Sequence, residues 1–265
     1  MAGPSDTISF EQHGLDRRTI NGRLSGSRNV TMLTLIGAPC GTYGEDCRHP
    51  TNTRIAQMME TAKFGPFNAT GLRPAVATLK AIMADIEAEK PAIHSSLTTA
   101  GMLCCRLVRG SATAISNHSW GTAIDLKIDG RLDARGDNRT QKGLLEIAPI
   151  FNRHKFFWGA AFPTQDCMHF EASEQLIHQW AAEGEFGAVP KADVIGEITL
   201  GDRSAEVEEL QATLNIALGL DVDIDGIFGK DTRAAVMEFQ REHGLTIDGV
   251  VGKDTLMALK EAGMR

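Results

Sequence analysis

Long apolar runs are missing from this sequence of 265 residues, and so are clusters of basic residues. No stretch of about 18 apolar residues occurs, so we expect no insertion into a membrane. The formal net charge is −7 and no long Lys/Arg run exists, which argues against nucleic acid as a partner. Residues 1–6 lack the basic and apolar regions of a secretory signal peptide, so we expect none.

Cysteine is also scarce, with five residues and no C-x-x-C pair. A structural zinc site with four cysteine ligands is therefore not expected. The odd number leaves at least one free thiol. Cys40 and Cys47 are close enough in sequence to form a loop disulfide, although no signal peptide points to an oxidising compartment.

Two segments have the patterns of β-strands. The apolar run 32–36 favours a short strand, which Gly37 and Pro39 would end. Residues 123–128 alternate, so that Ile124, Leu126 and Ile128 share one face while Asp125 and Lys127 share the other. This second pattern indicates a half-buried strand with a carboxylate on its polar face.

Helical periodicity appears in three places before residue 185. Apolar residues recur at helical spacing after Pro74, and this helix should stop before Pro91. A shorter helix around Leu144 should end or kink at Pro149. Ser173 has the position of an N-cap for a third helix.

The composition then changes, and an internal repeat follows. Residues 186–197 have the character of a linker, which predicts one domain over 1–185 and another over 198–265. The segment 225–232 returns 23 residues later as 248–255. Each copy predicts a tight turn entering a helix, with Asp and Thr side chains as caps. With a preceding helix this makes a unit of three helices.

Two polar segments in the first domain carry candidate chemistry. Segment 116–125 offers His118 and Asp125, and segment 165–171 offers His169. Two imidazoles and one carboxylate are enough to bind a catalytic zinc ion, with the fourth position left to water. By spacing alone, a His–Asp pair near a strand is more often a structural hydrogen-bonded pair than a pair of metal ligands.

The first segment resembles the SxHxxGxAxD signature of the M15 peptidases, a family that includes D,D-peptidases and phage L-alanyl-D-glutamate endolysins. Every fixed position is matched, namely by Ser116, His118, Gly121, Ala123 and Asp125. The second segment resembles the family's closing [DE]xxH motif through Asp166 and His169. The resemblance covers residues 30–185.

This resemblance implies a role for each residue and Zn²⁺ as the cofactor. His118, Asp125 and His169 would bind the zinc ion, and Asp166 would be the general base and acid. Ser116 would help to hold the substrate. An upstream arginine would contact the substrate or the developing oxyanion; we expect Arg106, with Arg109 as the alternative.

The general base raises a problem of geometry. If the strand is already regular at residue 166, Asp166 points away from His169, because side chains alternate along a strand. A bend or loop is therefore required there. Glu171 would lie on the face of His169 and is the alternative base. Cys167 would share that face too, but a fourth protein ligand would close the water site.

The C-terminal repeat resembles the peptidoglycan-binding domains that accompany many wall-active enzymes. The match lies in Val207-x-x-Leu210-Gln211, in the two Asp-Gly turns, and in Val236-x-x-Phe239-Gln240. The resemblance implies bacterial peptidoglycan as the partner. Most of these motif residues are expected to be structural.

Together these observations predict an α+β zinc peptidase domain with a small antiparallel sheet, followed by an all-α three-helix peptidoglycan-binding domain. The expected reaction is hydrolysis of the L-Ala–D-Glu bond of the stem peptide. A D,D-carboxypeptidase, a cross-link endopeptidase and a catalytically decayed wall-binding protein are the alternatives. We expect a monomer that is made in a host cytoplasm and reaches the cell wall after release, as phage endolysins do.

Overall fold

The computed structural model describes most of the chain in two compact units. The described residues are 3–44, 46–111, 114–187 and 198–264. The first unit comprises residues 1–193 and the second comprises residues 194–265. The linker expected at 186–197 lies, apart from residues 186 and 187, outside the described residues.

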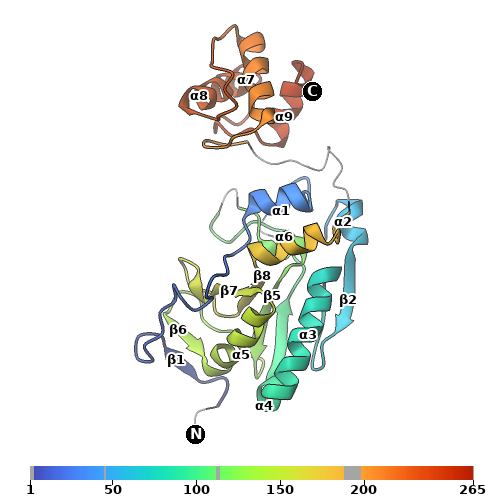
Figure 1. The fold of residues 1–265 in the computed structure, drawn as a ribbon, viewed down its shortest axis with the longest axis vertical. Coiled ribbons are helices and arrows are strands. Elements are labelled where there is room, and N and C mark those ends of the chain that lie inside the picture. Colours follow the sequence, from blue (N-terminus) through green and yellow to red (C-terminus); the bar gives the residue numbers. More distant parts are fainter. Residues whose placement is uncertain (1–2, 45, 112–113, 188–197, 265) are drawn as a thin grey trace. The chain divides into compact units, whose positions relative to one another are not determined.

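The first unit is built around an antiparallel sheet of four strands in the order β4-β5-β8-β7 (Figure 1). Its strands are β4 (Leu97–Gly101), β5 (Ala123–Ile128), β7 (Phe156–Trp158) and β8 (His169–Ala172). Two strand pairs accompany it, namely β1 (Thr7–Ser9) with β6 (Arg139–Gln141), and β2 (Met59–Lys63) with β3 (Asn68–Leu72). The expected α+β class with a small antiparallel sheet is confirmed.

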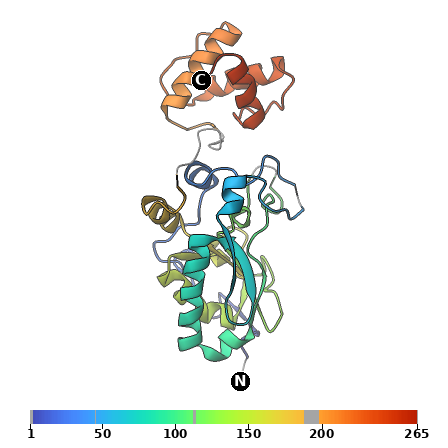
Figure 2. The ribbon, with the colours of Figure 1, turned by 90° about the vertical axis from the view of Figure 1, so that its right-hand side faces the viewer.

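The helices of this unit differ greatly in length. They are α1 (Asn29–Leu35), α2 (Thr53–Gln57), α3 (Arg73–Glu89), α4 (Pro91–Ser96), α5 (Lys142–Arg153) and α6 (Glu174–Ala182). Figures 1 and 2 show the β2–β3 hairpin beside the long helix α3. The apolar face of α3, which includes Leu79, Ile82 and Ile86, is buried, as its periodicity predicts.

The segment 32–36 is helical, so the prediction of a strand there was wrong. Met32, Leu33 and Ile36 are buried, and this spacing suits one face of a helix that contacts α6. Gly37 follows with a φ of 91° and donates its backbone N–H to the carbonyl of Leu33. A short apolar run does not by itself distinguish a strand from a helix.

Of the two effects expected at Pro149, an end or a kink of helix α5, the end does not occur. The helix continues through Pro149 to Arg153. Ile147, Ile150 and Phe151 are buried, and Phe151 stacks on Phe170 of the central sheet with ring centroids 4.0 Å apart. Burial of this face stabilises the last turn despite the missing proline N–H. The N-cap predicted at Ser173 is confirmed, since its side chain accepts the N–H of Leu176.

The disulfide joins Cys47 to a partner other than Cys40, the nearby cysteine that the sequence offered. Cys47 is bonded to Cys104 across a sequence separation of 57 residues, whereas Cys40 is a buried free thiol. Cys47 and Cys40 lie seven positions apart, but folding brings the loop around Cys47 against the segment after β4. The backbone N–H of Cys105 donates to the carbonyl of Arg48 in the same contact. Sequence proximity did not reveal this pairing.

The second unit consists of three helices and two nearly identical turns. The helices are α7 (Ala205–Leu218), α8 (Lys230–Glu242) and α9 (Lys253–Glu261). They enclose a separate apolar core that includes Leu210, Phe228 and Phe239. This agrees with the expected three-helix unit.

The turns of the repeat are held by glutamine and aspartate side chains, but neither Asp nor Thr caps the helix that follows. Gly229 and Gly252 are the N-caps of α8 and α9, and neither cap makes a side-chain hydrogen bond. Instead, Gln211 Nε2 donates to Asp225 Oδ1 at 2.9 Å and to Thr232 Oγ1 at 3.1 Å. Gln240 makes the same two contacts with Asp248 and Thr255, at 2.8 and 3.1 Å. The prediction of side-chain caps was therefore wrong.

Within the described residues, no helix has the length and apolar character needed to cross a bilayer.

Candidate active site

The turn between His118 and Asp125 is made by a short 3₁₀ helix, η1 (Asn117–Trp120), followed by Gly121. Gly121 has a φ of 63°, in the left-handed region that glycine adopts without strain. A Cβ at this position would lie 2.8 Å from the Cα of Gly71, so no side chain fits between the two backbones. The chain can thus reverse directly into β5 and bring His118 back towards Asp125.

Strand pairing brings the third residue to the same place. β5 and β8 are antiparallel neighbours, and Asp125 lies directly opposite His169 in their register. Directly opposed residues on one face have Cβ atoms about 5 Å apart. Two sequence segments more than forty residues apart therefore present their polar side chains at one point.

The three predicted ligands form a compact cluster of donor atoms. His118 Nε2 lies 3.2 Å from Asp125 Oδ1 and 3.2 Å from His169 Nδ1, and His169 Nδ1 lies 3.1 Å from Asp125 Oδ1. Both histidines are buried and Asp125 is partly buried. A tetrahedral zinc ion with ligands at about 2.0–2.1 Å would separate its ligand atoms by roughly 3.3 Å. The donor set and its spacing fit a zinc ion.

The outer nitrogen of each imidazole is hydrogen-bonded, which fixes the inner nitrogen as the one with a lone pair. His118 Nδ1 donates to the carbonyl of Met102 at 3.0 Å. His169 Nε2 donates to Glu171 Oε2 at 2.9 Å. In the neutral form of each ring, the inner nitrogen then has the lone pair that a metal ion would need, whereas without a metal ion a proton on these nitrogens bonds to Asp125.

Glu171 lies behind His169 rather than at the open side of the cluster. Its carboxylate also accepts the side-chain amide of Asn117 at 2.9 Å and the backbone N–H of Ser27 at 3.0 Å. The side chain is only 3% exposed. These bonds suit a residue that orients His169, and they leave little freedom for Glu171 to act as the alternative base.

The cluster attracts positive charge strongly. Burial alone would raise the pKa of Asp125, but hydrogen bonds with His118 and His169 hold it well below its usual range. Burial alone would lower the pKa of His169, but hydrogen bonds with Asp125 and Glu171 outweigh it and raise this pKa to about 10. The same negative surroundings would favour a divalent cation.

Asp166 lies in the loop before β8, which provides the required bend. The strand begins only at His169, whose backbone N–H donates to the carbonyl of Asp166 at 3.3 Å. Asp166 Oδ1 is buried and has no hydrogen-bond partner among the described residues. Burial raises the pKa of Asp166. A partly desolvated carboxylate with an unpaired oxygen is suited to accept a proton.

Arg106 and Ser116 are joined to each other through the backbone. The N–H of Ser116 donates to the carbonyl of Arg106 at 3.0 Å, and the N–H of Arg106 donates to Ser119 Oγ at 3.1 Å. Arg106 is half-buried, and burial together with the charge of Arg109 lowers its pKa. The charges of Asp125 and Asp166 also act on this pKa, which places Arg106 beside the cluster. Ser116 is buried.

One arginine near the cluster was not identified from the sequence. Arg135 Nε lies 3.6 Å from Asp166 Oδ2. Arg135 follows β5 in a loop outside both motifs, so no spacing pointed to it. Its charge also acts on Arg106.

Several other side chains that can bind metals lie outside the cluster. Cys167 is fully buried, where it accepts Gln165 Nε2, and burial raises its pKa to about 12. His154 pairs with Asp85 at 2.8 Å, and His178 lies 3.6 Å from Glu174.

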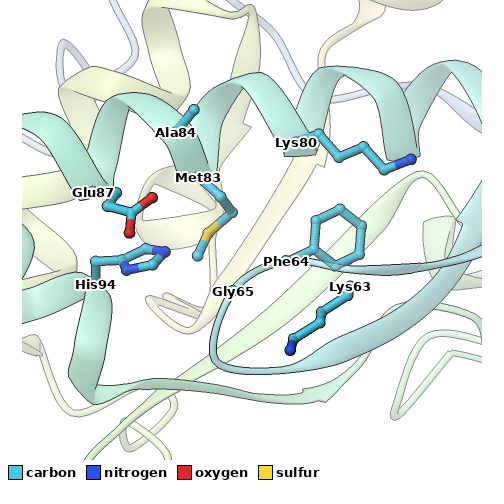
Figure 3. Close-up of a pocket in the computed structure, with 8 residues that line it drawn as sticks. All are labelled: Lys63, Phe64, Gly65, Lys80, Met83, Ala84, Glu87 and His94. Carbon is cyan, nitrogen blue, oxygen red and sulfur yellow. The ribbon is translucent and has the colours of Figure 1, made fainter.

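A small hollow lies in another part of this unit, between the β2–β3 turn and helices α3 and α4 (Figure 3). Its volume is about 200 Å³, less than the roughly 300 Å³ at which ligand pockets usually begin. It is lined by Lys63, Phe64, Gly65, Lys80, Met83, Ala84, Glu87 and His94. None of the predicted site residues lines it.

Two family models match separate parts of the chain. Residues 109–172 match an M15 peptidase family described as D-alanyl-D-alanine carboxypeptidase. Residues 203–259 match a putative peptidoglycan binding domain. The first match includes the three clustered residues and Asp166, whereas Arg106 lies just before it.

Among solved structures, Burkholderia AP3 phage endolysin is 46% identical to this chain, with a TM-score of 0.24. The similarity covers 26% of this chain and 26% of that chain, so it spans about a quarter of the endolysin. No curated protein matches the chain.

Proposed function

Because the chain carries an M15 peptidase domain followed by a peptidoglycan-binding domain, we propose that it is a zinc-dependent peptidase that hydrolyses the stem peptide of bacterial peptidoglycan. The observation that carries the proposal is the convergence of His118, Asp125 and His169 beside the unpaired oxygen of Asp166. Asp166 Oδ1 makes no hydrogen bond within the described residues, so it is available to accept one from a water molecule.

The zinc ion would be held by His118 Nε2, Asp125 Oδ1 and His169 Nδ1. When bound, zinc lowers the pKa of a water molecule and polarises the carbonyl of the scissile bond. Met102 and Glu171 keep the two imidazoles in the tautomers that zinc binding requires. Three protein ligands leave room for water, as in catalytic zinc sites.

Asp166 would move the proton. Its Oδ1 takes a proton from the attacking water and later returns it to the amine that leaves, which restores the carboxylate. Arg106 would stabilise the negative charge that develops on the carbonyl oxygen, and its half-buried position strengthens this effect. Ser116, tied to Arg106 through the backbone, would help to hold the substrate.

The bond we propose is L-Ala–D-Glu. A D,D-carboxypeptidase or a cross-link endopeptidase would use the same residues, because the shape of the substrate site decides which bond is cut. Mass spectrometry of purified peptidoglycan after digestion tests this, with and without a chelator. New D-Glu amino ends that appear only with zinc are the expected result, whereas free D-Ala or opened cross-links would require the other specificities.

The non-enzymatic alternative is a wall-binding protein with a decayed peptidase domain. It predicts that permeabilised cells are coated without any loss of turbidity, whereas a peptidase clears them. Zinc content does not separate the two, since a decayed site still holds a metal.

The second unit would hold the enzyme on its insoluble substrate and raise its local concentration there. A monomer is sufficient for both steps. The protein would be made in a host cytoplasm and would reach the wall at lysis. Deleting residues 190–265 should weaken wall binding in a sedimentation assay and leave cleavage of soluble fragments, whereas an unfolded truncated form would contradict the two-domain interpretation.

A further inference from the structure

Three guanidinium groups gather beside the candidate active site. Arg106 is close enough to Arg109 and Arg135 for both charges to lower its pKa, in addition to the effect of burial. The carboxylates of Asp125 and Asp166 act on this pKa in the opposite direction, and a negatively charged group of the substrate would add to their effect. The arrangement therefore favours a substrate that brings negative charge to the site.

Arg135 has the position best suited to bind such a group. Its Nε is 3.6 Å from Asp166 Oδ2, which is an ion-pair distance but too long for a hydrogen bond. No other ion pair or hydrogen bond of Arg135 occurs within the described part of the chain. A guanidinium has five N–H donors, so nearly all of them remain available.

The surroundings of Arg135 leave it open on one side. Its side chain is 37% exposed, while that of Asp166 is 21% exposed. A planar, partly desolvated guanidinium binds a carboxylate through two parallel hydrogen bonds. Since Arg135 already lies against the candidate base, a carboxylate bound there belongs to a residue adjoining the scissile bond.

We propose that Arg135 determines specificity by binding the free α-carboxylate of the residue that follows the scissile bond. A D-glutamate linked through its γ-carboxyl group retains this carboxylate, and amidation to D-isoglutamine removes its charge. The inference rests on the proposed L-Ala–D-Glu activity. Arg135 would thereby make the enzyme sensitive to amidation of the cell wall.

The test compares two soluble peptides, L-alanyl-γ-D-glutamyl-L-lysine and its α-carboxamide counterpart, with the zinc-loaded full-length protein. Hydrogen bonds to charged groups are worth about 1.5–3 kcal/mol, so kcat/KM should favour the acid by roughly 10- to 100-fold. Arg135→Gln should reduce this preference to near unity, and Arg135→Lys should restore part of it. Arg153→Gln, which alters an arginine paired with Asp85 and Glu89, should change neither value.

The rates of the two peptides in Arg135→Gln distinguish recognition of the carboxylate by Arg135 from a purely structural role. If Arg135→Gln slows both peptides by the same factor, Arg135 only positions Asp166 and the proposal is wrong. A preference for the acid that survives in Arg135→Gln overturns it as well. Such a comparison of protein and substrate changes isolates the pairwise interaction.

Binding provides a second readout that needs no turnover. Titration calorimetry on the metal-free protein should give a lower Kd for the acid than for the amide, and Arg135→Gln should remove the difference. Equal affinities in the unaltered protein would overturn the role of Arg135. Failure to cleave either peptide, with peptidoglycan cut elsewhere, would instead overturn the proposed bond while the calorimetry still tests Arg135.

Discussion

The two units use buried polar side chains in opposite ways. In the first unit, polar atoms of His118, Asp125 and His169 converge, and Asp166 Oδ1 has no partner among the residues that the structure describes. In the second unit, Gln240 bonds completely within its turn, since its Nε2 donates to Asp248 and Thr255 and its Oε1 accepts the N–H of Gly249.

This difference distinguishes a motif whose polar side chains are available to a ligand from a motif whose polar side chains stabilise the local fold. Both sequence motifs contain buried polar side chains, such as His118 in the first unit and Gln240 in the second. A motif residue that satisfies all its hydrogen bonds internally stabilises its own turn, as Gln211 and Gln240 do. Acceptor atoms that converge on one point, as in the His118 cluster, need a shared proton or a metal ion between them.

The largest effect should come from removing a convergent donor. His118→Ala and His169→Ala should each abolish zinc binding and activity together, because two ligands do not hold a catalytic ion. Elemental analysis and a turbidity assay measure the two properties. Gln211→Ala is the matched control from the second unit and should retain zinc. A His118→Ala protein that keeps full zinc content would show that the ion is bound elsewhere.

Removing the unpaired carboxylate should affect turnover alone. Asp166→Ala should keep its zinc and lose roughly 10²- to 10⁴-fold in kcat, the usual contribution of a general base. Single-turnover kinetics and metal analysis on the same sample check this. If Asp166→Ala stays active while Glu171→Ala is inactive, the base has been assigned to the wrong residue.

A second unsatisfied carboxyl group near the site should reduce stability in a pH-dependent way. Burial raises the pKa of Asp133 from its usual 3.8 to about 6, and its Oδ2 has no partner among the described residues. As pH rises from about 4 to about 6, the unfolded chain ionises first, so the folded state loses up to about 3 kcal/mol.

Asp133→Asn should therefore raise the free energy of unfolding at pH 7 and flatten its decline between pH 4 and pH 6. Gln141 N–H, which donates to Asp133 Oδ1 at 2.8 Å, keeps an acceptor in this variant. Urea titrations over this pH range provide the measurement. An unchanged slope would mean that Asp133 is already ionised in the folded protein.

A change at Glu171, which bonds to the predicted zinc ligand His169, should have a moderate effect on zinc affinity. Glu171→Gln keeps the shape but weakens the bond to His169 Nε2, so zinc affinity should fall by roughly 10- to 100-fold. Competition with a fluorescent chelator measures it. Glu146→Gln, on the surface of α5, is the control. An equal loss of zinc affinity in Glu146→Gln would show that the loss in Glu171→Gln does not come from the bond to His169.

The smallest effect on the candidate active site should come from the self-contained turn. Gln240→Ala removes the hydrogen bonds of Gln240 with Asp248, Thr255 and the N–H of Gly249, which should cost about 1–3 kcal/mol of stability. Differential scanning calorimetry should show this in the transition of the second unit alone. Zinc binding and cleavage of soluble peptides should not change.

The sequence predicted the site best where a family motif lies in a segment with regular polar and apolar alternation. The alternation over 123–128 predicts both the strand and the face that carries Asp125, and the glycine at 121 indicates the turn. To place Asp125 beside His169, only the pairing of β5 with β8 had to be known in addition. A motif of fixed spacing in a regular element therefore specifies much of the site.

Features that depend on distant contacts were not accessible in this way. The helix over 29–35 forms because its apolar face packs on α6, and α5 passes Pro149 because its last turn is buried. The partner of Cys47 and the contact between Arg135 and Asp166 arise from loops that only the folded chain brings together. No period or spacing in the sequence encodes them.

The pairing of Asp125 with His169 across β5 and β8 also bears on assembly of the sheet. A slip of one residue would set Phe170 against Asp125 and turn the imidazole to the opposite face. An ion shared by the two strands would thus be bound in the native register alone. Zinc binding would therefore stabilise the native register of β5 and β8 as the first unit folds. The second unit would fold without this dependence on a metal ion.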